Sequence, residues 1–575
     1  MASHVPYLTE SAGTGSEQRT ALTSAQRDRS TGKPSWYSWP LMLSGLCALV
    51  LGVLGAMTEY VRVVRYGLPL GWDEAEHAVD SLIVADDLRH GQWLRFFADS
   101  SAQHAYPPGM SWLQAPTFLL WQPDDISARY VSLLGLVTLA SATWALGVLL
   151  APRMTWLAGL MATSLLIASP LPLDLAGQSM NEILIANVLV VALCVHTRWR
   201  ESGRDYWAVL AGLAVFASWM TKYNYASFLL IAVIAEHAWS GDLAPSRFGR
   251  MFRLFYQPLA AGMAVWLAFD LSTKVQAIIG FGINQAANTR PSFWQTITFY
   301  PHVWLGGTWL AWSQAALTLG GVIAAVVLVR APRPRLVWLF LAVSWLLLTV
   351  HPNKQDRYLM PILPVLWALA AAGLSAGVWM AQQRLRWSRA GALLPTLMVA
   401  LGLMLGSLTL AWLPTVRQTD IARRDVIHAA FETIAANARA DQPLLFVGTF
   451  ADFGPHYVPW GLRTTWKRDG STVETDYAAL SYPGTRTGSD TDPSPNPAYA
   501  TRWAEWRQKH PTYCLATLKL DQGSPFWGGD YGSWNAWKLN YVEAIAASEP
   551  PPVATMENRQ FAITIRVYAP RQPAR

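Results

Sequence analysis

The sequence predicts a polytopic α-helical membrane protein with a small α/β domain at its C-terminal end. The chain of 575 residues is 52% hydrophobic and only 14% charged, whereas soluble globular proteins carry about 25% charged residues. Apolar runs of bilayer-crossing length recur as far as residue 413 and then stop. The net charge of +7 arises from short basic clusters between these runs, a pattern typical of membrane topology rather than of nucleic-acid binding.

The apolar runs predict about eleven membrane-spanning helices. They are placed at 39–59, 128–150, 156–174, 182–197, 205–221, 223–239, 254–272, 308–329, 336–350, 358–380 and 391–413. Residues 107–121 are also apolar, but this stretch is short and follows two prolines, so we expect an interfacial helix there. Residues 1–38 are polar and lack the apolar core of a signal peptide, which predicts a disordered cytoplasmic tail.

Arginine clusters between the spans predict the orientation. Arg198, Arg200 and Arg204 share one loop, and further clusters occupy alternate loops at 247–253, 330–335 and 384–389. The positive-inside rule places these loops and the N-terminus in the cytoplasm. We expect the membrane to be the inner membrane of a bacterium. Every polar cluster suited to chemistry then faces outward, starting with loop 60–127.

The amino-acid composition of the chain changes after the membrane domain, which is expected at 39–414. Charges, prolines and turn residues return, and 415–575 is expected to form a soluble extracytoplasmic α/β domain. Within it, 419–440 is predicted to be an amphipathic helix, and 484–497 a loop. Strands are predicted at 444–450, 513–520 and 561–568.

Asp73 and Glu74 follow the first span, at the expected membrane surface. A carboxylate near hydrocarbon is costly, so its presence requires a reason. We interpret Asp73 as a general base that deprotonates an acceptor hydroxyl, with Glu74 orienting it or binding a metal. The alternative is ordinary solvation, because the same loop contains several other acidic residues.

The sequence gives little support to a metal centre. The first loop contains no EF-hand motif and no Asp-x-Asp, which favours a metal-independent reaction, with a divalent cation at Asp73 and Glu74 as the alternative. No ligand spacing supports a metal site at the histidines considered, which are His77, His104, His302 and His351. The three cysteines show no metal or disulfide spacing.

Two further charged residues lie at the outward ends of spans. Glu182 is expected to open a helix, where it either favours the helix dipole or binds the sugar of a substrate and steers the acceptor. Lys222 stands between two long apolar spans. It either extends to the interface or neutralises a lipid phosphate held at that depth.

An outward basic cluster precedes the tenth span. Lys354, Arg357 and Tyr358 run against the positive-inside trend, so a topology signal does not explain them. Arginine is suited to bidentate phosphate binding. Phosphate recognition is therefore the favoured interpretation, with a structural pair between Arg357 and Asp356 as the alternative.

These motifs, in this order, resemble those of the GT-C superfamily of membrane glycosyltransferases. The likeness extends over about residues 40–380 and is greatest to protein O-mannosyltransferases and aminoarabinose-to-lipid A transferases. The matching motifs are Asp73-Glu74, Tyr106-Pro107-Pro108, Glu182, Thr221-Lys222 and Arg357-Tyr358-Leu359-Met360-Pro361. Lipid A transferases carry Glu-Lys-Pro where this chain has Tyr-Pro-Pro, so a basic phosphate ligand is missing there.

The resemblance implies an inverting hexosyl or pentosyl transferase that uses a polyprenyl-phosphate-linked sugar donor. Asp73 would be the base, and Lys222, Lys354 and Arg357 would stabilise the leaving phosphate. Glu182, Tyr106 and Tyr358 would complete the substrate site. The acceptor would be a lipid, a glycan or a protein.

Two other functions remain open on the sequence. A polyprenyl-lipid transporter would be expected to place polar features near the bilayer midplane, whereas the charges here lie at the outer ends of spans. A non-catalytic GT-C-like subunit of a membrane complex is the other alternative, although Asp73, Lys222 and Arg357 are all retained.

Overall fold

The computed structural model covers most of the membrane part and parts of the C-terminal domain. It describes residues 39–103, 106–268, 274–275, 292–305, 308–329, 334–351, 354–385, 388–413, 415–438, 443–448, 457–466, 505, 508–509, 512–520, 542–543 and 546–569. The predicted tail at 1–38, His104 and the predicted loop at 484–497 lie outside these residues.

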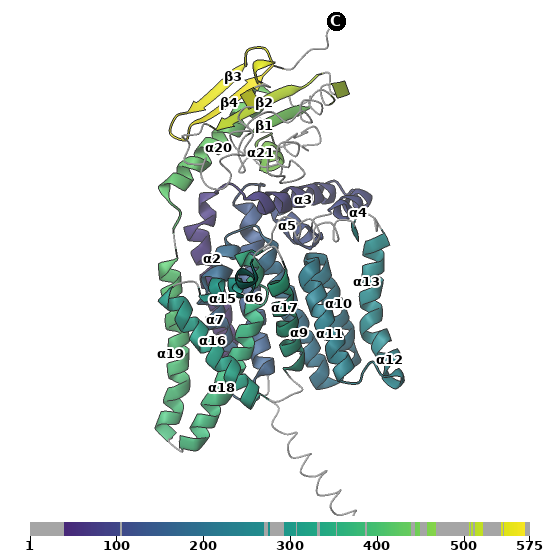
Figure 1. The fold of residues 1–575 in the computed structure, drawn as a ribbon, viewed down its shortest axis with the longest axis vertical. Coiled ribbons are helices and arrows are strands. Elements are labelled where there is room, and N and C mark those ends of the chain that lie inside the picture. The colour runs from purple at the N-terminus through teal and green to yellow at the C-terminus, as the bar shows by residue number, and fades with distance from the viewer. Residues whose placement is uncertain are drawn as a thin grey trace, which may run out of the picture.

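A helix lies over every span that the sequence predicts (Figure 1). The helices over these spans are α2 (Trp39–Arg62), α6 (Tyr130–Leu150), α7 (Thr155–Ile167), α8 (Pro170–Ala176), α9 (Asn181–Ser202), α10 (Asp205–Thr221), α11 (Tyr223–Trp239), α13 (Gln257–Ala268), α16 (Trp309–Leu328), α17 (Arg335–Val350), α18 (Leu363–Leu385) and α19 (Ser388–Trp412). Further short elements join them, namely η1 (Val64–Tyr66), η2 (Ser127–Arg129), α12 (Pro245–Met251), η3 (Phe252–Tyr256), α15 (Phe293–Leu305) and η4 (Asp356–Leu359).

Among the described helices, six are long and apolar enough to cross a bilayer. The pair α7 and α8 forms a seventh candidate span, bent by 68°. The bend follows from Pro170, which begins α8 and holds the preceding Ser169 in an extended conformation. The remaining helices over predicted spans are shorter, such as α17 with 16 residues. Together these apolar helices make the chain an integral membrane protein.

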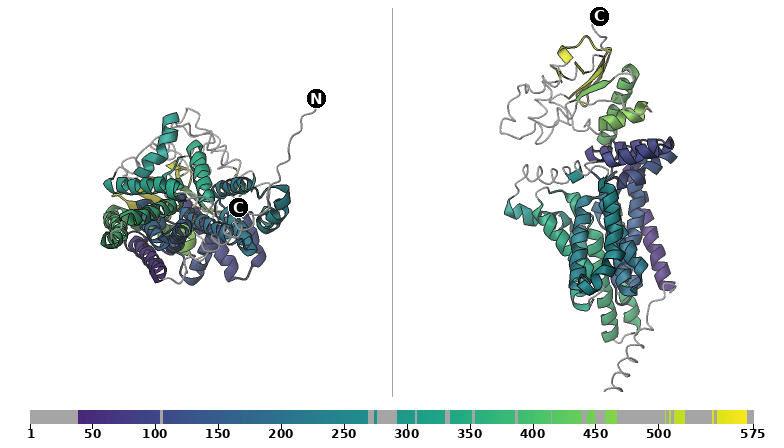
Figure 2. Two further views of the ribbon diagram at one scale, coloured as in Figure 1. Left: turned by 90° about the horizontal axis from the view of Figure 1, so that it is seen from below. Right: turned by 90° about the vertical axis from the view of Figure 1, so that its right-hand side faces the viewer.

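Three helices of loop 60–127 lie across one end of the bundle (Figures 1 and 2). They are α3 (Trp72–Arg89), α4 (Trp93–Ala102) and α5 (Gly109–Leu120), of which only α5 was predicted. The many charged residues of α3 obscure the helical pattern of its apolar residues, so the sequence did not predict this helix. Its apolar face is formed by Ala75, Ala78 and Ala85, which recur at helical spacing and are fully buried.

The C-terminal domain contains a four-stranded sheet and two longer helices. The helices are α20 (Gln418–Asn437) and α21 (Tyr457–Trp466), and the strands are β1 (Leu444–Gly448), β2 (Cys514–Leu520), β3 (Ala554–Asn558) and β4 (Ile563–Tyr568). The strand order is β1-β2-β4-β3, with β1 and β2 parallel and the other pairs antiparallel. The predicted α20, β1, β2 and β4 are confirmed, whereas β3 and α21 were not predicted.

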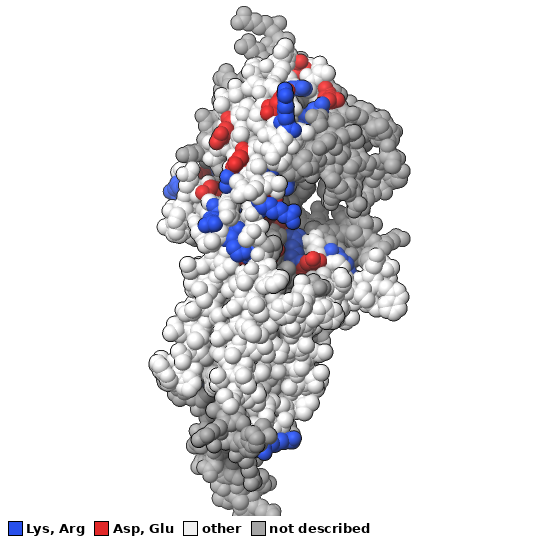
Figure 3. Space-filling view, turned by 90° about the vertical axis from the view of Figure 1, so that its left-hand side faces the viewer, with Lys and Arg blue, Asp and Glu red and all other residues white. Residues whose placement is uncertain are grey.

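The C-terminal domain is joined to the membrane part through Asp125. This buried carboxylate accepts a hydrogen bond of 2.8 Å from Trp460 Nε1 and lies 3.0 Å from His428 Nε2. The Trp460 ring also packs against Phe118 of α5. In Figure 3, charged side chains gather around this junction, and below it the surface is almost free of charge, as expected for contact with lipid.

We predict that Asp125→Ala loosens the C-terminal domain. The change leaves the buried Trp460 N–H without its acceptor, which costs about 1–3 kcal/mol. The expected result is faster cleavage by protease and a lower midpoint of thermal unfolding. Asp425→Asn, which changes an exposed carboxylate on α20, is the control. Equal cleavage of the two variants would contradict this assignment.

Candidate active site

An ion pair between Asp73 and Arg357 lies where α3 crosses the end of the bundle. Asp73 stands in the first turn of α3, and Arg357 in η4 between α17 and α18. The Arg357 Nη2 is 2.5 Å from Asp73 Oδ2, and both side chains are 20% exposed. Burial by itself would raise the pKa of Asp73, but the charge and hydrogen bond of Arg357 hold it below its usual range.

A second ion pair continues the first. Lys222, the extended residue between α10 and α11, donates to Glu182 Oε1 at 2.7 Å. The Arg357 Nε lies 3.6 Å from the same oxygen. The four side chains therefore alternate in charge, from Asp73 through Arg357 and Glu182 to Lys222, so that each buried charge has an opposite neighbour.

Two tyrosines flank the Lys222 ammonium. Its Nζ lies 5.8 Å from the ring centroid of Tyr106 and 5.6 Å from that of Tyr358, within the range of cation–π attraction. Tyr106 precedes α5, which meets the end of α10 closely. A Cβ on Gly109 would stand 2.5 Å from the Met220 carbonyl oxygen, so this approach requires glycine.

Buried polar atoms at the head of α9 extend the site. Among the described residues, Glu182 Oε2 and both polar side-chain atoms of Asn181 are buried without a hydrogen-bond partner. Such atoms are rare in folded proteins, because each costs free energy when it is withdrawn from water unpaired. These atoms leave the charge cluster with unused hydrogen-bonding capacity.

Two comparisons with known sequences gave no match, either to a protein-family model or to a curated protein. Among solved structures, ArnT from Cupriavidus metallidurans bound to undecaprenyl phosphate matches with a TM-score of 0.54 and 14% identity, covering 92% of this chain and 97% of that chain. The archaeal oligosaccharyltransferase AglB from Archaeoglobus fulgidus, in complex with an inhibitory peptide and a dolichol-phosphate, matches with a TM-score of 0.51 and 12% identity, covering 88% of this chain and 72% of that chain.

Both of these proteins are GT-C superfamily membrane glycosyltransferases. The chain has the GT-C fold. At such low identity the likeness establishes the architecture alone, and it confirms the fold class predicted from the motifs. The four alternating charges lie on elements of the GT-C fold at the end of the bundle that faces the C-terminal domain.

Glu74 is adjacent to Asp73 in the sequence but faces a different part of the GT-C fold. Its Oε1 accepts hydrogen bonds from Ser179 N at 2.7 Å and from Arg129 Nε at 3.2 Å. Its Oε2 accepts from Gly71 N at 2.7 Å. Glu74 therefore fixes the start of α3 to the segment before α9. Both Glu74 oxygens thus have partners of their own, whereas Asp73 is paired with Arg357.

Lys354 also lies apart from the alternating charges. Its ammonium donates to the carbonyl oxygens of Leu348 at 2.7 Å and Thr349 at 2.6 Å. These carbonyls belong to the last turn of α17, which has no further helical donors for them. In this structure Lys354 therefore caps α17 and fixes the segment that carries Arg357.

Arg129 and Gln114 support the site but were not singled out in the sequence. The Gln114 side chain links three elements, because it accepts from Ser81 Oγ of α3 at 2.6 Å and donates to Ser179 Oγ at 2.8 Å. Arg129 is 3% exposed and holds Glu74. Its sequence signal was a lone arginine at the outward head of a span, where the positive-inside rule does not explain it.

We predict that Glu76 makes the protein less stable at alkaline pH. Burial, followed by repulsion from Asp80 and Asp73, raises the pKa of Glu76 to about 8. A carboxyl whose folded pKa is raised favours the folded state at low pH, and this contribution is lost as the pH rises through about 8. The thermal midpoint should fall between pH 6 and pH 9, and Glu76→Gln should reduce that fall.

The exposed Glu432 of α20 provides the control for this experiment. Glu432→Gln should leave the pH dependence of the thermal midpoint as it is in the unmodified protein. A Glu76→Gln variant with the full pH dependence would show that the instability arises at another group.

Proposed function

We propose that this protein is a glycosyltransferase that moves a sugar from a polyprenyl-phosphate donor to an acceptor hydroxyl at the outer membrane–water interface. The observation that carries the proposal is the cluster of Asp73, Arg357, Glu182 and Lys222 at one end of a GT-C bundle. The structures of two proteins of this fold were solved with undecaprenyl phosphate and with a dolichol-phosphate bound, which supports a lipid-linked donor.

The donor phosphate would bind to Arg357 and Lys222. The guanidinium offers a planar fork that matches phosphate oxygens, and the ammonium adds a second positive charge. In the structure both cations are paired with carboxylates. A phosphate must therefore compete with Asp73 for Arg357, and binding of the donor is coupled to release of that carboxylate.

This release would make Asp73 a better base. The carboxylate has a depressed pKa while Arg357 holds it, and a depressed pKa disfavours proton uptake. When the donor phosphate takes Arg357, the largest charge that offsets the desolvation of Asp73 is withdrawn. The pKa of Asp73 then rises towards the range useful for proton transfer. Asp73 would thus become an effective base only after the donor has bound.

The transfer step follows from these positions. The acceptor oxygen attacks the anomeric carbon from the face opposite the phosphate, and its proton passes to an Asp73 oxygen. The bond between the anomeric carbon and the phosphate oxygen breaks, and the phosphate leaves with the electron pair. Arg357 and Lys222 stabilise its developing negative charge. Attack from the opposite face inverts the configuration at the anomeric carbon.

The remaining residues of the cluster would position the sugar. Glu182 Oε2 and the Asn181 side chain have unused hydrogen-bonding capacity, which suits sugar hydroxyls. Tyr106 and Tyr358 flank Lys222 and would limit the space beside the phosphate. Glu74 and Lys354 would act indirectly, Glu74 by fixing α3 and Lys354 by fixing the segment before Arg357.

Asp73→Asn should abolish transfer while the protein still folds. Loss of a general base lowers the rate by roughly 10²–10⁴-fold, and the amide retains the shape of the side chain. Transfer is measured in proteoliposomes with a panel of polyprenyl-phosphate sugars. Asp356→Asn, on an exposed carboxylate next to Arg357, is the control. Transfer by Asp73→Asn at the unmodified rate would remove Asp73 as the base.

Arg357→Ala should weaken the binding of undecaprenyl phosphate by at least about tenfold, because a charge-assisted contact contributes roughly 1.5–3 kcal/mol. Binding is measured by titration of the protein in nanodiscs. Lys354→Ala is the informative comparison, since Lys354 caps α17 and should affect affinity less. Unchanged affinity in Arg357→Ala would exclude that residue from the phosphate site and favour a non-catalytic subunit.

A further inference from the structure

A second cluster of chemically versatile side chains lies at the opposite end of the same helices. His196 belongs to the last turns of α9, and Glu236 and His237 to the last turns of α11. These two helices begin beside Glu182 and Lys222, so the second cluster is separated from the first by most of the bundle. All three residues are buried, with at most 3% of their surface exposed.

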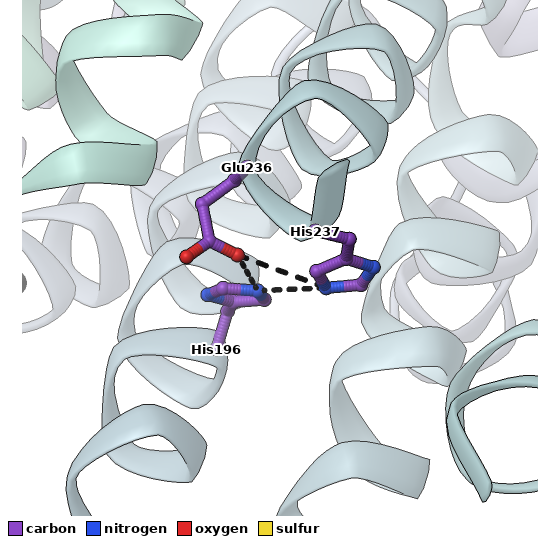
Figure 4. A group of neighbouring side chains, drawn as sticks. All are labelled: His196, Glu236 and His237. Atoms are coloured by element: carbon purple, nitrogen blue, oxygen red, sulfur yellow. Dashed lines mark hydrogen bonds and ion pairs between the residues drawn. The ribbon is translucent and has the colours of Figure 1, made fainter. Parts of the chain in front are cut away.

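The three side chains direct their ligand atoms at one another, as Figure 4 shows. The Nε2 atoms of His196 and His237 are 3.2 Å apart. Glu236 Oε2 lies 3.6 Å from the first of these nitrogens and 3.9 Å from the second. The point in the plane of these three atoms that is equidistant from them therefore lies about 2.1 Å from each, the usual length of bonds from zinc to imidazole nitrogen and carboxylate oxygen.

From this geometry we propose that His196, Glu236 and His237 bind one divalent transition-metal ion, with zinc as the best match. Two imidazoles and one carboxylate suit zinc better than magnesium or calcium, which prefer oxygen ligands. Three ligands in one plane leave a position above it for a fourth. The site would join the ends of α9 and α11 and is independent of the proposed transferase reaction.

The surroundings of the cluster fit a bound cation. Tyr256 Oη lies 2.9 Å from His237 Nδ1, so this nitrogen can carry its proton and leave Nε2 free for the metal. Ser240 Oγ donates to the other oxygen of Glu236 at 2.8 Å and thereby orients the carboxylate.

Two contacts among the described residues would give way to a metal. One is the hydrogen bond between the Nε2 atoms of His196 and His237. The other is made by Arg200, which contacts Glu236 Oε2. Its Nη1 lies 2.6 Å from Asp242 Oδ2, so the guanidinium keeps a carboxylate partner when the metal takes the Glu236 oxygen. Arg200 thus stands between two negative charges. Arg247 approaches Asp242 at 3.9 Å from an exposed position, where solvent screens its charge.

The test measures zinc in the purified full-length chain, with any affinity tag removed. The protein in detergent is stripped with chelator, exposed to zinc chloride, freed of unbound ion and analysed by mass spectrometry of the metal. We expect about one zinc ion per chain. Binding of no zinc by the unmodified protein would overturn the proposal.

Cobalt(II) substitution should give the intense visible absorption of a four-coordinate site with mixed nitrogen and oxygen ligands.

The double change His196→Gln and His237→Gln should lower the bound zinc to below about one tenth of an ion per chain, because two of three ligands are lost. His90→Gln, on an exposed histidine at the end of α3, is the control and should keep the full amount. If the double variant retains its zinc, the ion is adventitious and the proposal fails.

A milder variant covers the case in which the double change prevents folding. Tyr256→Phe removes only the hydroxyl next to His237 Nδ1 and should weaken zinc affinity by roughly tenfold. Zinc should also raise the thermal midpoint of the unmodified protein. The same rise in Tyr256→Phe should require a higher zinc concentration. Identical zinc titrations for the two proteins would contradict coordination by His237 Nε2.

Discussion

The ion pair between Asp73 and Arg357 is the interaction on which the rest of the candidate site depends. It joins α3, which crosses the end of the bundle, to η4, which lies between two late helices. Glu182 and Lys222 continue the same chain of charges from α9 and from the turn after α10. Ionised groups in such a partly dry setting need opposite partners, so the ends of these helices must converge.

This self-neutralised arrangement determines how the site can respond to a ligand. Both cations of the cluster, Arg357 and Lys222, are already paired with carboxylates. An anionic ligand therefore gains affinity only by replacing one of these carboxylates. A phosphate on a lipid carrier satisfies that requirement, and the released carboxylate is the proposed base. A neutral ligand would leave both ion pairs in place. In the proposed reaction, the same contacts would account both for selectivity towards phosphate and for control of the base.

The sequence predicted the helical bundle well, because bilayer-crossing apolar runs are long and periodic. It also identified the members of the charge cluster, but not their pairing, since Asp73 and Arg357 are far apart in the chain. Asp73 and Glu74 are neighbours on α3 but their side chains point in different directions, so Glu74 reaches Arg129 rather than the cluster. The helix α3 was missed because its small buried residues are alanines among charges, and His196 lacked any local motif that would connect it to His237.

The most direct test is a high-resolution structure of the purified protein with undecaprenyl phosphate bound. Density for the phosphate is expected between Lys222 and Arg357, with the Arg357 guanidinium moved from Asp73 to the phosphate oxygens. Asp73 should then face the phosphate across the space that a sugar would occupy. A lipid bound elsewhere, with the pair between Asp73 and Arg357 intact, would contradict the proposed function.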